Sequence, residues 1–108
     1  MPKAIKSLAA ANDEVVMNAS SDEIEEVVVQ LVGAFVGVVQ LQVSNDDTNT
    51  NFIAMQVTNM NSGGAAATDM TAPGVYKAQV SAVRQVKAKM TTFTSGGPTV
   101  VTLSLNKV

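Results

Sequence analysis

The side chains best suited to chemistry form one polar cluster between two apolar runs: Asp46, Asp47, Asn49 and Asn51. Their carboxylate and amide oxygens are ligands that calcium prefers. The spacing lacks the glycine and the distal glutamate of an EF-hand loop. Asp, Asn, Ser and Thr also favour local hydrogen bonds to the backbone, so a solvated hairpin tip explains the cluster equally well. We therefore predict no metal site, with calcium as the lesser alternative.

A second group of charged residues could support acid–base chemistry. Glu23, Glu25 and Glu26 lie close together in sequence, but no partner cleft can be identified for them. We interpret them as a solvated strand edge that charge protects against unwanted pairing. Lys87 and Lys89 fall on one outward face of a predicted strand, where they serve the same purpose or meet acids of a neighbouring subunit. We predict no catalytic residue in either group.

The residue types that most enzymes need are missing. The chain has no histidine and no cysteine, so the usual general base, the usual zinc ligands and disulfides are all excluded. The glycine pairs Gly63-Gly64 and Gly96-Gly97 lack the flanking lysine and the following helix of a phosphate-binding loop. Tyr76, the single tyrosine, is interpreted as a core or rim aromatic. We predict that the protein is not an enzyme and binds no cofactor.

Period-two alternation of apolar residues predicts the elements that carry these side chains. The clearest case is residues 33–57, which indicate a long strand, a polar tip and a returning strand. In the first strand Phe35, Val39, Leu41 and Val43 share one face. Shorter runs bounded by turn signals predict further strands at 15–17, 24–32, 66–70, 75–80, 86–90 and 101–105. The pattern is typical of an all-β antiparallel sandwich, immunoglobulin-like or jelly-roll, with about seven or eight strands.

The domain organisation expected from 108 residues is a single domain. Residues 1–12 are interpreted as an extended N-terminal arm and residues 13–108 as the β-sandwich. The apolar stretch 8–11 is too short for the hydrophobic region of a secretion signal. No apolar run approaches the roughly 20 residues of a membrane span. We expect no association with a membrane.

Charge is divided unevenly along the chain. Residues 1–70 hold all nine acids and two lysines, whereas residues 71–108 hold five basic residues and no acid. Either the two regions face each other within one fold, which we favour, or copies of the protein meet acidic side to basic side. Five basic residues and few aromatics do not predict nucleic-acid binding.

Several residues follow one another in a recognisable order between positions 28 and 105. These are Gly33, Phe35, Gly37 and Leu41, then Ser44, Asp46 and Phe52, then Gly74 and Tyr76, then Arg84, Val86, Lys87 and Lys89, and finally Ser95, Gly96, Val101 and Leu103. This order resembles a group of small virion proteins of tailed bacteriophages. The chain departs from it by having Phe where Trp is frequent and Asp-Thr-Asn where Asp-Gly is frequent. Those changes leave the fold intact but alter anything that the loop binds.

The resemblance implies a structural role in the virion. Within it we favour a capsid decoration (cement) protein, made in the host cytoplasm, that bridges and stabilises the major capsid protein on the outer head surface. We expect a homo-oligomer, with a trimer favoured. Its arm is expected to order on binding, so deleting residues 2–12 should leave the fold intact but weaken assembly. The first alternative is a neck, tail or fibre component that uses loops 44–51 and 59–72 to contact a receptor. The second is a carbohydrate-binding or adhesion module.

Overall fold

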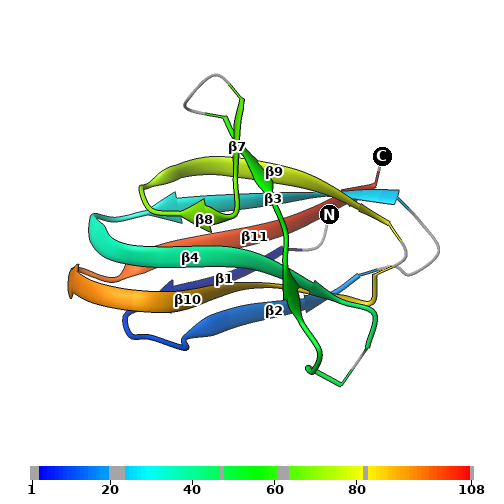
Figure 1. Ribbon diagram of the computed structural model, residues 1–108, viewed down its shortest axis with the longest axis horizontal. Coiled ribbons are helices and arrows are strands. Elements are labelled where there is room, and N and C mark those ends of the chain that lie inside the picture. The colour runs from blue at the N-terminus through cyan, green and yellow to red at the C-terminus, as the bar shows by residue number, and fades with distance from the viewer. Residues whose placement is uncertain (1–2, 20–23, 47, 61–63, 82, 108) are drawn as a thin grey trace.

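Two antiparallel β-sheets packed face to face make up this protein, as a computed structural model shows (Figure 1). The structure describes residues 3–19, 24–46, 48–60, 64–81 and 83–107. The six-stranded sheet has the order β1 (Lys3–Leu8), β11 (Thr99–Lys107), β3 (Ile24–Val32), β9 (Gly74–Ser81), β6 (Val57–Asn59) and β7 (Ala65–Ala67). The five-stranded sheet has the order β2 (Glu14–Asn18), β10 (Gln85–Gly96), β4 (Phe35–Ser44) and β5 (Ile53–Ala54), and β8 (Asp69–Met70) also pairs with β4.

The predicted all-β sandwich is therefore confirmed, and the described residues form eleven strands in place of the predicted seven or eight. The difference arises from β1 and from four strands of two or three residues between positions 53 and 70. The described residues include no helix that could cross a membrane.

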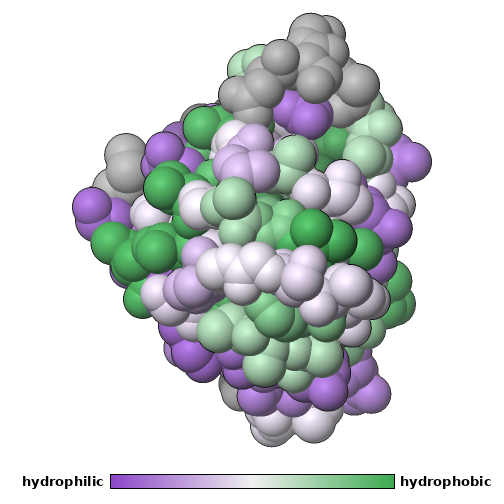
Figure 2. Space-filling view, turned by 90° about the vertical axis from the view of Figure 1, so that its left-hand side faces the viewer, coloured by the Kyte–Doolittle hydropathy of each residue, from purple (hydrophilic) through white to green (hydrophobic). Residues whose placement is uncertain are grey.

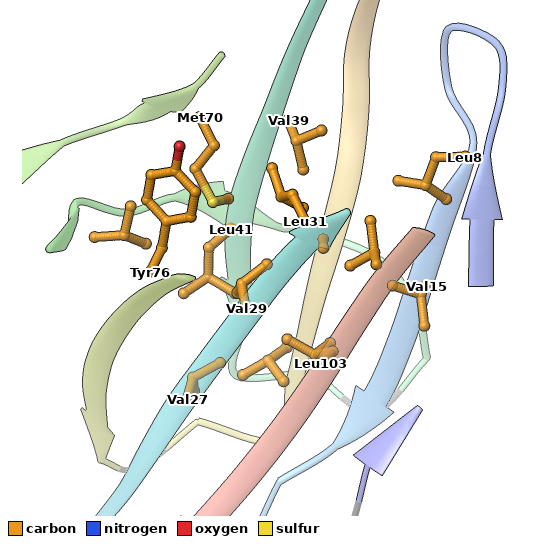
Figure 3. Packing of buried hydrophobic residues seen from close by; sticks show 14 of the residues in the cluster. Leu8, Val15, Val27, Val29, Leu31, Val39, Leu41, Met70, Tyr76 and Leu103 are labelled. Atoms are coloured by element: carbon orange, nitrogen blue, oxygen red, sulfur yellow. The ribbon is translucent and has the colours of Figure 1, made fainter. Parts of the chain in front are cut away.

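The core lies between the two sheets and is built from alternate residues of their strands (Figure 3). In β4 the predicted inward residues Phe35, Val39 and Leu41 are buried, while Val43 near the strand end is half-buried. Aliphatic and sulfur-containing side chains that are at most 2% exposed fill the layer: Leu8, Val27, Val29, Leu31, Val39, Leu41, Met70, Met90, Leu103 and Leu105. Tyr76 is a core aromatic, and its hydroxyl donates to the Ala72 carbonyl at 2.7 Å.

The expectation of a free arm at residues 1–12 is wrong for the described part of that segment. Residues 3–8 form β1, which pairs with β11 over its whole length. Leu8 is fully buried in the core, and Lys6 Nζ donates to the Glu14 carbonyl at 3.0 Å. β1 is an edge strand that docks through its pairing with β11 and through Leu8 and the partly buried Ala4. Lys6 stands between these two on the same side of the strand, so the apolar alternation of the segment is weak.

The prediction that Glu25 and Glu26 lie at a strand edge is wrong. β3 runs between β11 and β9 in the interior of its sheet, so charge at this position does not protect an edge. Glu25 is buried, and Glu26 pairs with Lys77 of β9 at 3.8 Å. Glu23 lies outside the described residues.

The strand predicted to return from the polar tip divides between the two sheets. β5 pairs with β4, whereas β6 pairs with β9 in the other sheet. Met55 marks the transition, since its backbone N–H donates to the Leu41 carbonyl at 3.0 Å. In Figure 1 the segment that carries β5 and leads into β6 passes across the front of β10 and β4.

Consecutive strands β10 and β11 also belong to different sheets. Gly96, the last residue of β10 before the turn, has a φ of +102° that favours glycine. β10 pairs with β4 with two register shifts, and between them Gly37 lies opposite Phe93 and close to the Thr92 carbonyl. A Cβ on Gly37 would collide with the Thr92 carbonyl oxygen, so this close approach requires glycine.

Candidate functional site

The polar tip after β4 folds back over the outer face of the five-stranded sheet. The backbone N–H of Asn49 donates to Gln85 Oε1 of β10 at 2.7 Å. Gln85 Nε2 in turn donates to Asn18 Oδ1 of β2 at 3.1 Å. Gln85 is only 7% exposed because the tip covers it. The tip is thus anchored across two neighbouring strands by one glutamine side chain.

Lys87 lies beside Gln85 on the same face, and its predicted exposure is wrong. The strand face was predicted correctly, but Lys87 is only 7% exposed. Its Nζ lies 2.9 Å from Glu14 Oε2 of β2 and 4.0 Å from the centre of the Phe52 ring. The ammonium therefore has a carboxylate partner and an aromatic face, which together compensate for the lost water. Lys89, two residues further along, is half-buried.

The ion pair with Lys87 changes the pKa of the Glu14 carboxylate. Burial alone would raise the pKa of Glu14. The hydrogen bond and charge of Lys87, a hydrogen bond with Asn49 and the charge of Lys89 outweigh burial and lower that pKa below its ordinary value. The surroundings of Glu14 therefore stabilise it as the carboxylate partner of Lys87.

The tip itself is held by its own side chains. Ser44 Oγ donates to the Thr50 carbonyl at 2.6 Å and accepts from the Asp46 N–H at 3.0 Å. Asn51 Nδ2 donates to Asp46 Oδ2 at 2.6 Å. Asn49 and Asn51 have φ near +60°, a conformation that asparagine tolerates better than most residues. Three of the four calcium candidates thus shape the tip itself: Asn49 and Asn51 through their backbone angles, and Asp46 through hydrogen bonds within the tip. The fourth, Asp47, lies outside the described residues.

A shallow open hollow of about 430 Å³ lies beside this tip. Its lining combines aliphatic side chains with amides, a hydroxyl and a carboxylate: Val43, Ser44, Asn45, Asp46, Asn51 and Ile53. Within the described ranges no three acidic side chains converge on a point where a metal ion could bind. The chemistry that this hollow offers is hydrogen bonding beside an apolar surface.

Two ion pairs between described residues explain part of the uneven charge. Glu14–Lys87 and Glu26–Lys77 each join an acid of residues 1–70 to a base of residues 71–108. For these four residues the prediction that the two regions face each other within one fold is confirmed.

Sequence reasoning missed Glu14, Gln85 and Phe52 as parts of one cluster. Gln85 lies opposite Asn18, and Lys89 lies opposite Glu14, in the pairing of β10 with β2. β2 and β10 are about 70 residues apart in sequence, so only knowledge of their pairing would have brought Glu14 and Gln85 together. Phe52 reaches the cluster from the segment after β4.

The fold of this protein is also found in a solved structure. No protein-family model matches the chain, and no curated protein is similar to it in sequence. Its structure is similar to the crystal structure of the SPBc2 prophage-derived protein YomS, with a TM-score of 0.67 and 15% identity. The match covers 97% of this chain and 94% of that one. The two proteins therefore share one β-sandwich fold over nearly their whole lengths.

Proposed function

We propose that this protein is a structural component of a bacteriophage virion, with decoration of the capsid as its favoured role. The observation that supports the proposal most strongly is the shared fold with a prophage-derived protein, which extends over 97% of the chain. The ordered motifs between residues 28 and 105 point independently to virion proteins of tailed phages.

The form of the molecule suits bridging. A sandwich with extents of 39 × 32 × 22 Å offers two broad faces, and a small rigid module of this kind can touch several shell subunits at once. Multivalent contact makes individually weak contacts collectively tight. In this proposal the partners are the major capsid protein and further copies of the chain.

The experiment that tests the proposal is a count of copies per purified phage particle by quantitative mass spectrometry, with antibody labelling to locate them. A decoration protein is expected at hundreds of copies on the head. A count between a handful and some dozens at the neck or tail would retain the virion role and replace decoration by the neck, tail or fibre alternative. Absence from particles would refute a virion role.

A second candidate function is supported by the hollow beside the polar tip. Its amides and carboxylate next to Val43 and Ile53 resemble, in chemistry, the mixture that recognises a sugar ring, where hydroxyls need hydrogen bonds and carbon faces need apolar contact. Binding of the isolated protein to a glycan array, lost on Asn51→Ala, would favour a receptor-binding or adhesion role.

A further inference from the structure

The amine of Lys87 is buried, although lysine is almost never fully buried in a protein. The surface has room for charge, since hydrophilic and hydrophobic residues are interspersed over the end of the sandwich that faces the viewer in Figure 2. The Lys87 side chain is nevertheless only 8% exposed, whereas that of Lys77, which also pairs with a glutamate, is 43% exposed. Removal of an amine from water is one way in which proteins prepare a lysine to act as a nucleophile.

The residues that cover Lys87 come from the polar tip. The Phe52 ring centre lies 4.0 Å from Nζ. Asn49 is fixed at two points: its backbone N–H donates to Gln85 Oε1, and its side chain hydrogen-bonds to Glu14. In the pairing of β10 with β2, Lys87 lies between Gln85 and the position opposite Glu14. Asn49 therefore lies over Lys87, because it reaches to both sides of it.

An amine and an amide thus meet at one carboxylate. Lys87 Nζ lies 2.9 Å from Glu14 Oε2. An ionised carboxylate can only accept hydrogen bonds, so the Asn49 group directed at Glu14 is the amide nitrogen Nδ2. Glu14 is placed to move protons between these two nitrogens. With the ring of Phe52 shielding Nζ from water, these groups have the types and the positions needed to join an amine to an amide carbon.

We propose that Lys87 and Asn49 form an intramolecular isopeptide bond, with Glu14 as the general base and acid. The Glu14 carboxylate takes a proton from the ammonium, and the neutral Nζ attacks Cγ of Asn49. The Cγ–Nδ2 bond then breaks, and Nδ2 leaves with the proton that Glu14 returns. A second proton follows the same route, so the products are a secondary amide and an ammonium ion. Glu14 ends as the carboxylate it was, and no group is oxidised or reduced.

The rate of this step is limited by the ion pair itself. While Lys87 is protonated its nitrogen has no free electron pair, so newly purified protein should contain both side chains intact and the bond should form slowly. Once formed, the bond fastens the polar tip to β10 and persists when the domain unfolds. This inference is independent of the virion role, since either can fail while the other holds.

Intact-mass spectrometry during incubation of the purified protein at neutral pH tests the proposal. Loss of ammonia should lower the mass of the 11.2 kDa chain by about 17 Da. Residues 7–77 contain no basic residue before Lys77, so trypsin should release peptide 7–77 joined to peptide 85–89, which stays uncut at Lys87. A wild type that keeps its full mass over weeks of incubation would overturn the proposal. So would a mass loss without the joined peptides, which marks a succinimide at an asparagine.

Matched substitutions assign the role of each residue. Glycine tolerates the φ near +60° of both Asn49 and Asn51, but only Asn49→Gly, and not Asn51→Gly, should abolish the mass loss. Lys87→Arg should also abolish it, whereas Lys89→Arg should retain it. Glu14→Gln should slow it at least about 100-fold. Circular dichroism verifies that each variant is folded. A mass loss that persists in folded Asn49→Gly or Lys87→Arg, or an unchanged rate in Glu14→Gln, would contradict the proposed chemistry.

Discussion

Docking of β1 onto the core is tested by two substitutions in the same strand. Leu8 is fully buried, whereas Ile5 is 60% exposed on the outer face. Truncating either residue to alanine removes three carbon atoms. At about 0.8 kcal/mol per buried carbon, Leu8→Ala loses ~2.4 kcal/mol of transfer free energy. The cavity left behind brings the expected loss to about 3 kcal/mol.

Ile5→Ala should cost much less. Since more than half of that side chain is in water in the folded protein, the expected loss is about 1 kcal/mol. The resulting difference of ~2 kcal/mol corresponds to melting temperatures that differ by roughly 8–15 °C in a domain of this size. Urea unfolding measures it directly, at a protein concentration low enough that self-association does not contribute.

The result that would refute this reasoning is equal stability of the two variants. It would mean that β1 does not pack on the core, and the interpretation of residues 1–12 as a free arm would return. Deletion of residues 2–12 gives the coarser version of the same test. It should now destabilise the whole domain, because it exposes one side of β11 and removes Leu8.

Three further predictions concern the remaining contacts. The lowered pKa of Glu14 means that its ion pair stabilises the fold above the ordinary glutamate pKa of about 4.3 and that this contribution is lost as pH falls through the lower folded-state pKa. Glu14→Gln should therefore lower the urea midpoint at pH 7, and its deficit relative to the wild type should shrink at pH 3; a constant deficit would contradict the assignment. Gly37→Ala should destabilise by about 1–3 kcal/mol because the new Cβ collides with the Thr92 carbonyl, and an unchanged melting temperature would show that the close approach is absent. Tyr76→Phe should cost about 1 kcal/mol through its lost hydrogen bond to Ala72, measured by calorimetry; a neutral effect would count against that bond.

Strands with an unambiguous alternation could be predicted from the sequence. β3 and β11 occur close to the predicted positions 24–32 and 101–105, because their inward residues are aliphatic and their turns carry glycine. The sandwich fold follows from these strands, since each buries one face. Turn chemistry also located the polar tip after β4, where Asn49 and Asn51 adopt left-handed backbone angles.

The position of each strand in its sheet could not be predicted, and the errors follow from that. Glu25 and Glu26 were assigned to an edge because charge is common there, but β3 has neighbours on both sides. Lys87 was placed on the correct face and wrongly in solvent, because a segment more than 30 residues earlier covers it. The alternation of apolar residues predicts which face of the sheet a side chain lies on. It does not predict whether another segment of the chain covers that face.

The place of β10 and β11 in the two sheets has a consequence for how the chain reaches its folded state. β10 lies between β2 and β4, and β11 lies between β1 and β3. A chain that has emerged from the ribosome only as far as residue 84 therefore holds each sheet as separated pieces with unpaired strands. Arrival of one connected pair of strands completes both sheets, so folding should occur late and in a single cooperative step. Until that moment the exposed edges of β1, β2, β3 and β4 are the points at which nascent chains would aggregate.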